Sequence, residues 1–206
     1  DSFFTDMFKA SAAAPNKING ASCALDARHG GKIEYRGFVH TFYPMIPPET
    51  YFATHPEYYS EIDGVRTADR AQLCLTNPDV LKIVIENVKK GFRDNPYAKI
   101  ASVSQNDWYN NCQCPKCRAI DEEEGSPMGS LLRFVNAVAD AVRDEFPDRY
   151  IDTLAYQYTR KPPKLTRPRD NVIIRLCSIE CCFSHSFEKC AALDRDGQSL
   201  NGKFVD

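Results

Sequence analysis

Amphipathic helices and short apolar runs alternate along the chain from residue 77 onward, and this order constrains the fold most. Apolar residues recur at helical spacing over about 78–93 and again from Leu131 to Phe146, where the amphipathic pattern is strongest. The runs 99–104, 150–158 and 171–180 are short and rich in apolar or β-branched residues, as buried strands are. Strands of this kind, separated by helices, predict parallel βα units.

The predicted fold class is therefore α/β, a TIM-type (β/α) barrel or part of one, forming a single domain over residues 1–206. A further strand is expected at Phe38–Phe42, ended by the prolines that follow, and residues 1–37 are expected to be an irregular entry segment that starts with a short helix. Four strands are about half of an eight-stranded barrel, so we expect a partial barrel and a fragment of a longer protein.

An open doubly wound sheet is the alternative fold for the same order of elements. No glycine-rich phosphate motif follows any of the predicted strands, which weakens the dinucleotide-binding version of that alternative.

Composition excludes several classes of function. Of the 206 residues, 43% are hydrophobic and 26% charged, and the formal net charge is -2. The interspersed charges form no basic stripe of the kind that neutralises phosphates, so nucleic acid is not an expected partner. No apolar run approaches the roughly 18 residues that a membrane span requires. The sequence leaves the oligomeric state open.

The candidate functional residues are the polar and aromatic side chains that follow the predicted strands. In parallel α/β folds, ligands bind at the carboxyl ends of the strands. Acids, amides and aromatic faces together suit a carbohydrate, because rings stack on its C–H faces and two carboxyl groups carry out cleavage. The set consists of His40, Asn106, Asp107, Trp108, Tyr156, Gln157, Tyr158, Arg175, Glu180 and His185.

Each of these side chains also has a purely structural interpretation. Asp107 can cap the loop after its strand, Glu180 can pair with a nearby cation, and Trp108 can belong to the core. For His40 and His185, a hydrogen-bonded structural role is the commoner one. Their shared position at strand ends favours the functional interpretation for the set as a whole.

Three segments resemble the central strand region of the glycoside hydrolase family 20 β-hexosaminidases. They are Leu73–Val80, which leads into a helix, then Ser102–Trp108, and then the Cys-Pro-Lys-Cys sequence at 114–117. In that family a similar helix start precedes a strand that ends in Gly-Gly-Asp-Glu, followed by a tryptophan and a Cys-Pro-x-Cys pair.

A closer resemblance is to an uncharacterised, glycosidase-like bacterial family of domains of unknown function, found beside α-glucuronidase-type N-terminal domains. It is carried by residues 55–58, 152–158 and 175–180, and the likeness covers about 38–190. The resemblance implies a bacterial, exported protein of glycan or polysaccharide breakdown, located in the periplasm, outside the cell or at the outer membrane.

The resemblance also implies catalytic roles for three residues. Asp107 takes the place of the hexosaminidase general acid, a glutamate, and Asn106 that of the neighbouring aspartate, which orients the 2-acetamido group of the substrate. Asn106 supplies no charge and Asp107 is one methylene shorter, so the resemblance does not fix a 2-acetamido sugar as the substrate. Glu180 is the expected second carboxylate: a separation from Asp107 of about 5–5.5 Å would indicate a retaining enzyme, and about 6.5–9.5 Å an inverting one. The expected substrate-binding residues are His40, Trp108, Tyr156, Tyr158, Arg175 and His185.

The nine cysteines raise a separate hypothesis. Cys112, Cys114 and Cys117 are candidate ligands of a structural zinc ion, with the fourth thiolate expected from among Cys181, Cys182 and Cys190. In an exported protein the same residues can form disulfides, and free thiols are the third alternative.

Three functions thus follow from the sequence. The first is a glycoside hydrolase that needs no cofactor and uses carboxyl-based acid catalysis. The second is a barrel that binds glycans without cleaving them, because Asn106 has replaced a required carboxylate. The third is a zinc-stabilised interaction domain.

Overall fold

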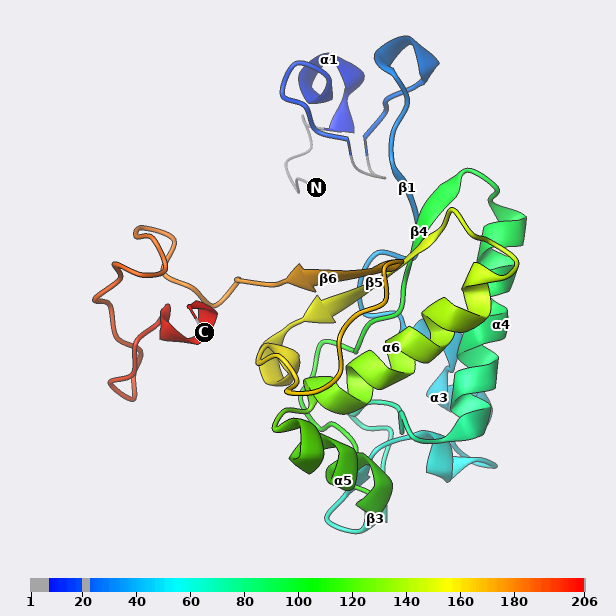
Figure 1. Ribbon diagram of the computed structural model, residues 1–206, viewed down its shortest axis with the longest axis vertical. Coiled ribbons are helices and arrows are strands. Elements are labelled where there is room, and N and C mark those ends of the chain that lie inside the picture. The colour runs from blue at the N-terminus through cyan, green and yellow to red at the C-terminus, as the bar shows by residue number, and fades with distance from the viewer. Residues whose placement is uncertain (1–7, 20–22, 206) are drawn as a thin grey trace.

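A four-stranded parallel sheet forms the centre of the molecule (Figure 1). The computed structural model describes residues 8–19 and 23–205. Ile100 pairs with Tyr150 across the middle of the sheet, and Ile151 pairs with Val172 at the next strand. In the order in which they lie side by side, the strands are β1 (Glu34–Arg36), β4 (Ala98–Ser102), β5 (Tyr150–Ala155) and β6 (Val172–Leu176).

Two long helices, α4 (Pro78–Asp94) and α6 (Met128–Arg143), pack against each other and against the sheet (Figure 1). The stretches before β1 and after β6 extend away from this layered core. The smaller elements are α1 (Ala10–Ala13), η2 (Ala27–His29), α2 (Phe42–Met45), α3 (Pro48–Tyr51), η3 (Pro56–Tyr58), the β2–β3 hairpin (Glu61–Ile62 and Val65–Arg66), α5 (Pro115–Glu124), η4 (Gln157–Thr159) and η5 (Gly202–Phe204).

The main hydrophobic core lies between the two helices and the sheet. Its largest buried side chains include Phe42, Phe92, Leu131, Leu132 and Ile151, each at most 1% exposed. Burying a side chain of this size contributes roughly 1.5–3 kcal/mol. The sheet is therefore covered by the apolar stripes of the same two helices that the sequence pattern predicts.

The start of α4 shows how local chemistry sets an element boundary. The Asn77 side chain accepts hydrogen bonds from the backbone N–H groups of Asp79 and Val80, at 2.9 and 3.3 Å. Pro78 occupies the first helical turn, where no backbone N–H is required. The prediction of a helix over about 78–93, capped by Asn77, is confirmed.

The predicted strands at 99–104, 150–158 and 171–180 are confirmed, although each ends earlier than expected. β5 is followed by the turn η4. There the Tyr156 N–H donates to the Thr159 hydroxyl and the Thr159 N–H donates to the Tyr156 carbonyl, both at 3.1 Å. The second predicted helix is also confirmed as α6, which begins at Met128.

Two predictions about the remaining segments are wrong. Phe38–Phe42 does not form a strand: β1 lies earlier, inside the segment expected to be irregular, and Phe42 begins the helix α2. The stretch between the strand at 99–104 and the helix from Leu131, where no helix was predicted, contains α5, which ends at Glu124 and is followed by Gly125 in the left-handed conformation. The weak apolar face of α5 explains why its sequence gave no helical signal.

The fold class is mixed α/β with a parallel sheet, and β1 and β6 are its edges within the described residues. A closed barrel is not found over 8–19 and 23–205. Within the same ranges, no helix is both long and apolar enough to cross a membrane.

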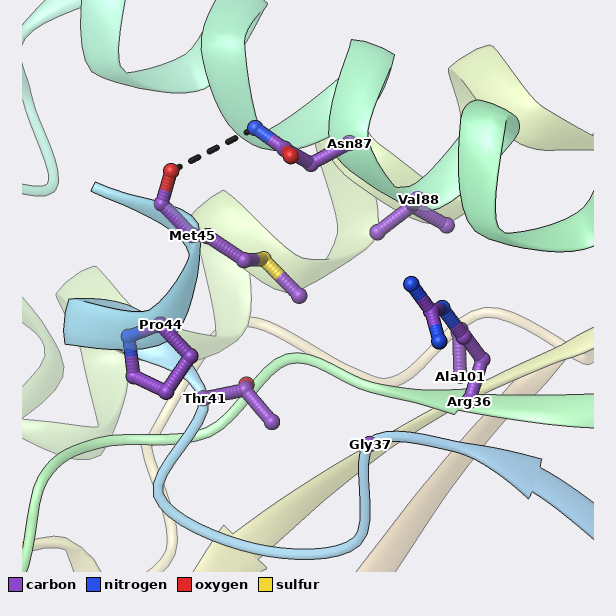
Figure 2. Close-up of a pocket in the computed structure, with 8 residues that line it drawn as sticks. All are labelled: Arg36, Gly37, Thr41, Pro44, Met45, Asn87, Val88 and Ala101. Atoms are coloured by element: carbon purple, nitrogen blue, oxygen red, sulfur yellow. Dashed lines mark hydrogen bonds between the residues drawn. The ribbon is translucent and has the colours of Figure 1, made fainter. Parts of the chain in front are cut away.

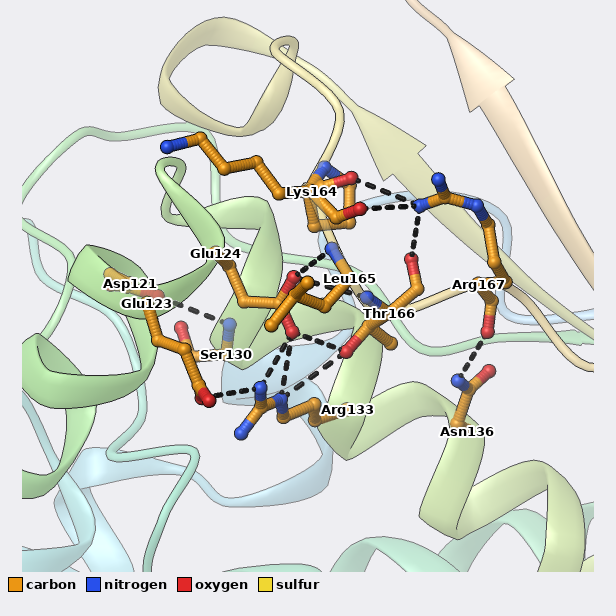
Figure 3. A network of polar contacts seen from close by, with 11 residues as sticks. Asp121, Glu123, Glu124, Ser130, Arg133, Asn136, Lys164, Leu165, Thr166 and Arg167 are labelled. Atoms are coloured by element: carbon orange, nitrogen blue, oxygen red, sulfur yellow. Dashed lines mark hydrogen bonds and ion pairs between the residues drawn. The ribbon is translucent and has the colours of Figure 1, made fainter.

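A buried carboxylate joins α5, α6 and the proline-rich connector before β6 (Figure 3). Glu124 has no exposed surface and accepts hydrogen bonds from the backbone N–H groups of Leu165 and Thr166 and from the Thr166 hydroxyl. Arg133 adds a salt bridge at 2.6 Å. Burial alone would raise the pKa of Glu124, but the hydrogen bonds from Thr166, Leu165 and Arg133 outweigh it and hold the pKa at about 2.

Replacing Glu124 by glutamine is expected to destabilise the fold by about 3 kcal/mol, because the new amide group faces hydrogen-bond donors in a buried site. The matched control is Glu123→Gln, since Glu123 also pairs with Arg133 but is largely exposed. The control is expected to cost less than about 1 kcal/mol. Urea unfolding of both variants measures the difference, and equal losses would show that the buried network is not a main support.

Acid is expected to remove the contribution of Glu124. Its pKa is lowered on folding, so the stabilisation is complete above the unfolded value of 4.5 and is lost as the pH falls from there towards about 2. The difference in unfolding free energy between wild type and Glu124→Gln should therefore shrink between pH 5 and pH 3. A difference that stays constant over this range would rule out Glu124 as the titrating group.

Candidate functional site

Three predicted site residues from separate segments meet at the carboxyl edge of the sheet. His40 follows β1, Asp107 follows β4 and Tyr156 follows β5. The Tyr156 hydroxyl donates a hydrogen bond of 2.8 Å to Asp107 Oδ1, and His40 Nε2 lies 3.9 Å from the same oxygen. The rings of His40 and Tyr156 are 5.9 Å apart. We call His40, Asp107 and Tyr156 the rim triad.

The backbone fixes the orientation of His40. Its φ of 56° is in the left-handed region, which a residue with a side chain rarely adopts. Its Nδ1 lies 2.8 Å from the carbonyl oxygen of Gln105, so Nδ1 carries the proton of that hydrogen bond and Nε2 faces Asp107. Strained backbone of this kind is concentrated at functional sites.

Tyr156 interacts electrostatically with two carboxylates, those of Asp107 and Glu180. Burial raises the pKa of Tyr156 to about 12, and the hydrogen bond to Asp107 and the negative charges of Asp107 and Glu180 add to the effect. The phenol therefore keeps its proton at neutral pH and acts as a donor. Asp107 itself is open to solvent, with 60% of its side chain exposed.

Asn106 lies next to this triad but points into the protein. It is 3% exposed, and its amide donates to the Ala71 carbonyl at 2.8 Å and accepts from the Tyr43 N–H at 3.2 Å. Both polar ends of the side chain are therefore occupied by backbone groups. The geometry gives Asn106 a positioning role for the loop that carries Asp107.

Gln72 also supports the loop that carries Asp107, although it was not among the predicted site residues. Its side-chain oxygen accepts from the Asn106 N–H at 2.8 Å, and its amide nitrogen donates to the carbonyl groups of Asn106, Trp108 and Tyr109. Gln72 is 1% exposed. The one sequence signal that could have pointed to it is the position of a glutamine directly beside an apolar run.

Partly exposed aromatic side chains follow Asp107 in the same loop. Trp108 is 39% exposed and its ring centre lies 5.8 Å from that of Tyr43. The rings of Tyr109 and Tyr158 are 6.4 Å apart, and Tyr109 is 55% exposed. Exposed rings next to a carboxylate can stack on an apolar ligand face.

Glu180, the expected second carboxylate, is held by cations. It pairs with Arg160 and with Lys203, whose Nζ lies 3.2 Å from Oε2. Burial raises the pKa of Glu180, but Lys203 and Arg160 outweigh burial, so its pKa lies below the usual value. Its charge reaches Tyr156, whereas no contact joins Glu180 to Asp107 within the described residues.

Arg175, which was expected to bind substrate, contacts Asp152 and Phe38 within the protein. Its guanidinium pairs with Asp152 at 2.6 Å, donates to the Phe38 carbonyl at 2.9 Å and lies over the Phe38 ring at 4.4 Å. Asp152 is 1% exposed; burial raises its pKa, which Arg175 partly opposes. In the sequence, this pair is signalled by a single acidic residue in one apolar strand and an arginine in the next strand.

His185 lies apart from the rim triad, in the stretch after β6. Its Nδ1 is 3.1 Å from Cys182 Sγ and 3.9 Å from Cys190 Sγ. The hydrogen bond from His185 lowers the pKa of Cys182 to about 7. The structure therefore groups this histidine with cysteines.

Six of the nine cysteines gather in two groups within the described residues, and neither group is the predicted one. Cys112, Cys114 and Cys117 lie together as expected, but the fourth member of their group is Cys74. The expectation that Cys181, Cys182 or Cys190 would complete it is wrong, because the stretch after β6 extends away from α5 (Figure 1). The four buried thiols could bind a metal ion such as zinc.

A pocket of about 260 Å³ lies between the end of β1, α2 and α4 (Figure 2). Arg36, Thr41 and Asn87 supply its polar side chains, and Met45 and Val88 much of its apolar wall. The predicted site residues are not among those described as lining it. The pocket is thus distinct from the rim triad.

The hydrogen bond between Tyr156 and Asp107 predicts a measurable shift. In Asp107→Asn, the pKa of Tyr156 should fall below about 12 because a negative charge is removed, while burial still keeps it above the ordinary value near 10. Ultraviolet titration of tyrosinate, with Tyr156→Phe to identify the signal, measures this change. An unchanged titration would show that the two groups do not interact in solution.

No curated protein shows a significant match to the chain. The model of the family described as Domain of unknown function (DUF4838) matches residues 3–200. Because this match spans nearly the whole sequence, the chain belongs to the family of the Domain of unknown function (DUF4838).

Proposed function

We propose that the chain is a glycoside hydrolase domain that acts on a complex glycan or polysaccharide, with Asp107 as the proton donor. The observation that carries the proposal is the rim triad, which places an exposed carboxyl group, a phenol and an imidazole at the carboxyl edge of a parallel sheet. Enzymes of parallel α/β architecture use this edge for chemistry.

The proposed chemistry divides the oxygens of Asp107 between protein and substrate. Tyr156 and His40 both approach Oδ1, so Oδ2 is the oxygen that would take up a proton from solvent before each reaction and deliver it to the glycosidic oxygen. The hydrogen bond from Tyr156 would stabilise the carboxylate that this transfer leaves. Trp108 and Tyr109 would stack on the sugar rings.

Glu180 is proposed to stabilise the positive charge that develops at the anomeric carbon. Arg160 and Lys203 keep it ionised, which suits a stabilising or nucleophilic carboxylate and does not suit an acid. In this proposal the four strands are part of a (β/α) barrel, and the protein is exported by a bacterium.

Replacing the proposed acid tests the activity. The chain is assayed on a panel of aryl glycosides and polysaccharides, as wild type, Asp107→Asn and Asp63→Asn. Asp63 is a matched control because it lies in the β2–β3 turn with a φ of 49°, which asparagine tolerates. Loss of roughly 10²–10⁴-fold in kcat/KM is expected for Asp107→Asn alone. Undiminished turnover in Asp107→Asn would contradict the role of Asp107.

A glycan-binding domain without activity is the second candidate. It is favoured by Asn106, whose amide is fully engaged by backbone and which stands where a carboxylate would be required. Binding of glycans by wild type and Asp107→Asn alike, with no turnover in either, would support this candidate over the hydrolase.

A further inference from the structure

Four buried cysteine thiols gather at the end of the loop that carries Asp107. Cys74 lies just before α4, Cys112 follows the Asp107 loop, and Cys114 and Cys117 lie at the start of α5. Each is at most 5% exposed, and none forms a disulfide. All four sulfur atoms lie within 4.8 Å of one another.

The spacing of the sulfurs matches tetrahedral metal coordination. With Zn–S bonds of about 2.3 Å, a regular tetrahedron places its sulfurs about 3.8 Å apart. Cys74 Sγ lies 3.8 Å from Cys114 Sγ and 4.0 Å from Cys117 Sγ. A disulfide would require about 2.05 Å between one pair, far shorter than either of these distances.

The surroundings of the sulfurs suit thiolates. The backbone N–H of Glu61 points to Cys112 Sγ at 3.4 Å, and Arg66 Nη1 lies 3.6 Å from the same sulfur. The Thr76 hydroxyl is 3.3 Å from Cys117 Sγ. Hydrogen-bond donors and a cation around metal-bound sulfur stabilise its negative charge.

We infer that Cys74, Cys112, Cys114 and Cys117 bind one structural zinc ion. Four protein ligands leave no open coordination position, so the ion holds the fold and does not activate water. The ion would join the start of α5 to the segment that contains Gln72, two residues before Cys74. The inference concerns stability and does not depend on the proposed hydrolase activity.

Zinc analysis of the full chain tests this inference. The protein is purified under reducing conditions without chelator, as wild type, Cys74→Ser and Cys23→Ser. Cys23 is the matched control, because it is a buried cysteine outside the cluster. We expect about one zinc ion per chain in wild type and Cys23→Ser, and markedly less in Cys74→Ser. Chelation of wild-type zinc should lower the Tm by roughly 10 °C.

Three results would overturn the inference. They are wild-type protein without zinc, a full equivalent of zinc retained in Cys74→Ser, or recovery of the four cysteines as two disulfides. If Cys74→Ser does not fold, wild type reconstituted with cobalt gives the answer instead. A sulfur-to-cobalt charge-transfer band with tetrahedral visible bands supports the site, and their absence rejects it.

Discussion

The interlocked amides of Gln72 and Asn106 are the constraint on which the carboxyl edge of this sheet depends. Asn106 joins its own strand end to Ala71 and to Tyr43, while Gln72 returns three hydrogen bonds to the loop that follows. Both side chains are almost fully buried. Leaving a buried amide without a hydrogen-bond partner costs about 1–3 kcal/mol of stability. These hydrogen bonds therefore favour one conformation of the loop that contains Asp107.

This constraint explains how an exposed carboxyl group can be held in place. Asp107 has little packing of its own, but the residue before it is locked, and Tyr156 approaches it from the next strand. Two of the four grouped cysteines, Cys74 and Cys112, are close in sequence to Gln72 and to the end of the loop. Buried groups that do not face solvent therefore fix the position of the loop that carries Asp107.

The sequence predicted the elements whose signals are local. Asn77 and Pro78 specify the start of α4, and the apolar stripe around Leu131 specifies α6. It failed where the local signal was weak: α5 has only a faint apolar stripe, and β1 is too short to show a pattern. For the site, strand-end position brought Asp107 and Tyr156 together correctly, whereas His40 reaches them from a loop because its predicted strand is not formed. It could not reveal that Arg175 would be taken up by Asp152, or that Cys74 would join cysteines about 40 residues away, because both depend on tertiary contacts.

The central claim is that the edge around Asp107 receives a carbohydrate, and Trp108 offers the most direct test. It is the one tryptophan of the chain, and its half-exposed ring lies one residue from Asp107. Its fluorescence can be followed while oligosaccharides from a broad glycan panel are titrated into the protein. The account predicts a saturable change in Trp108 emission that persists in Asp107→Asn, since stacking does not need the carboxyl group. Saturable glycan binding by calorimetry with unchanged Trp108 emission, or no binding to any member of the panel, would contradict it.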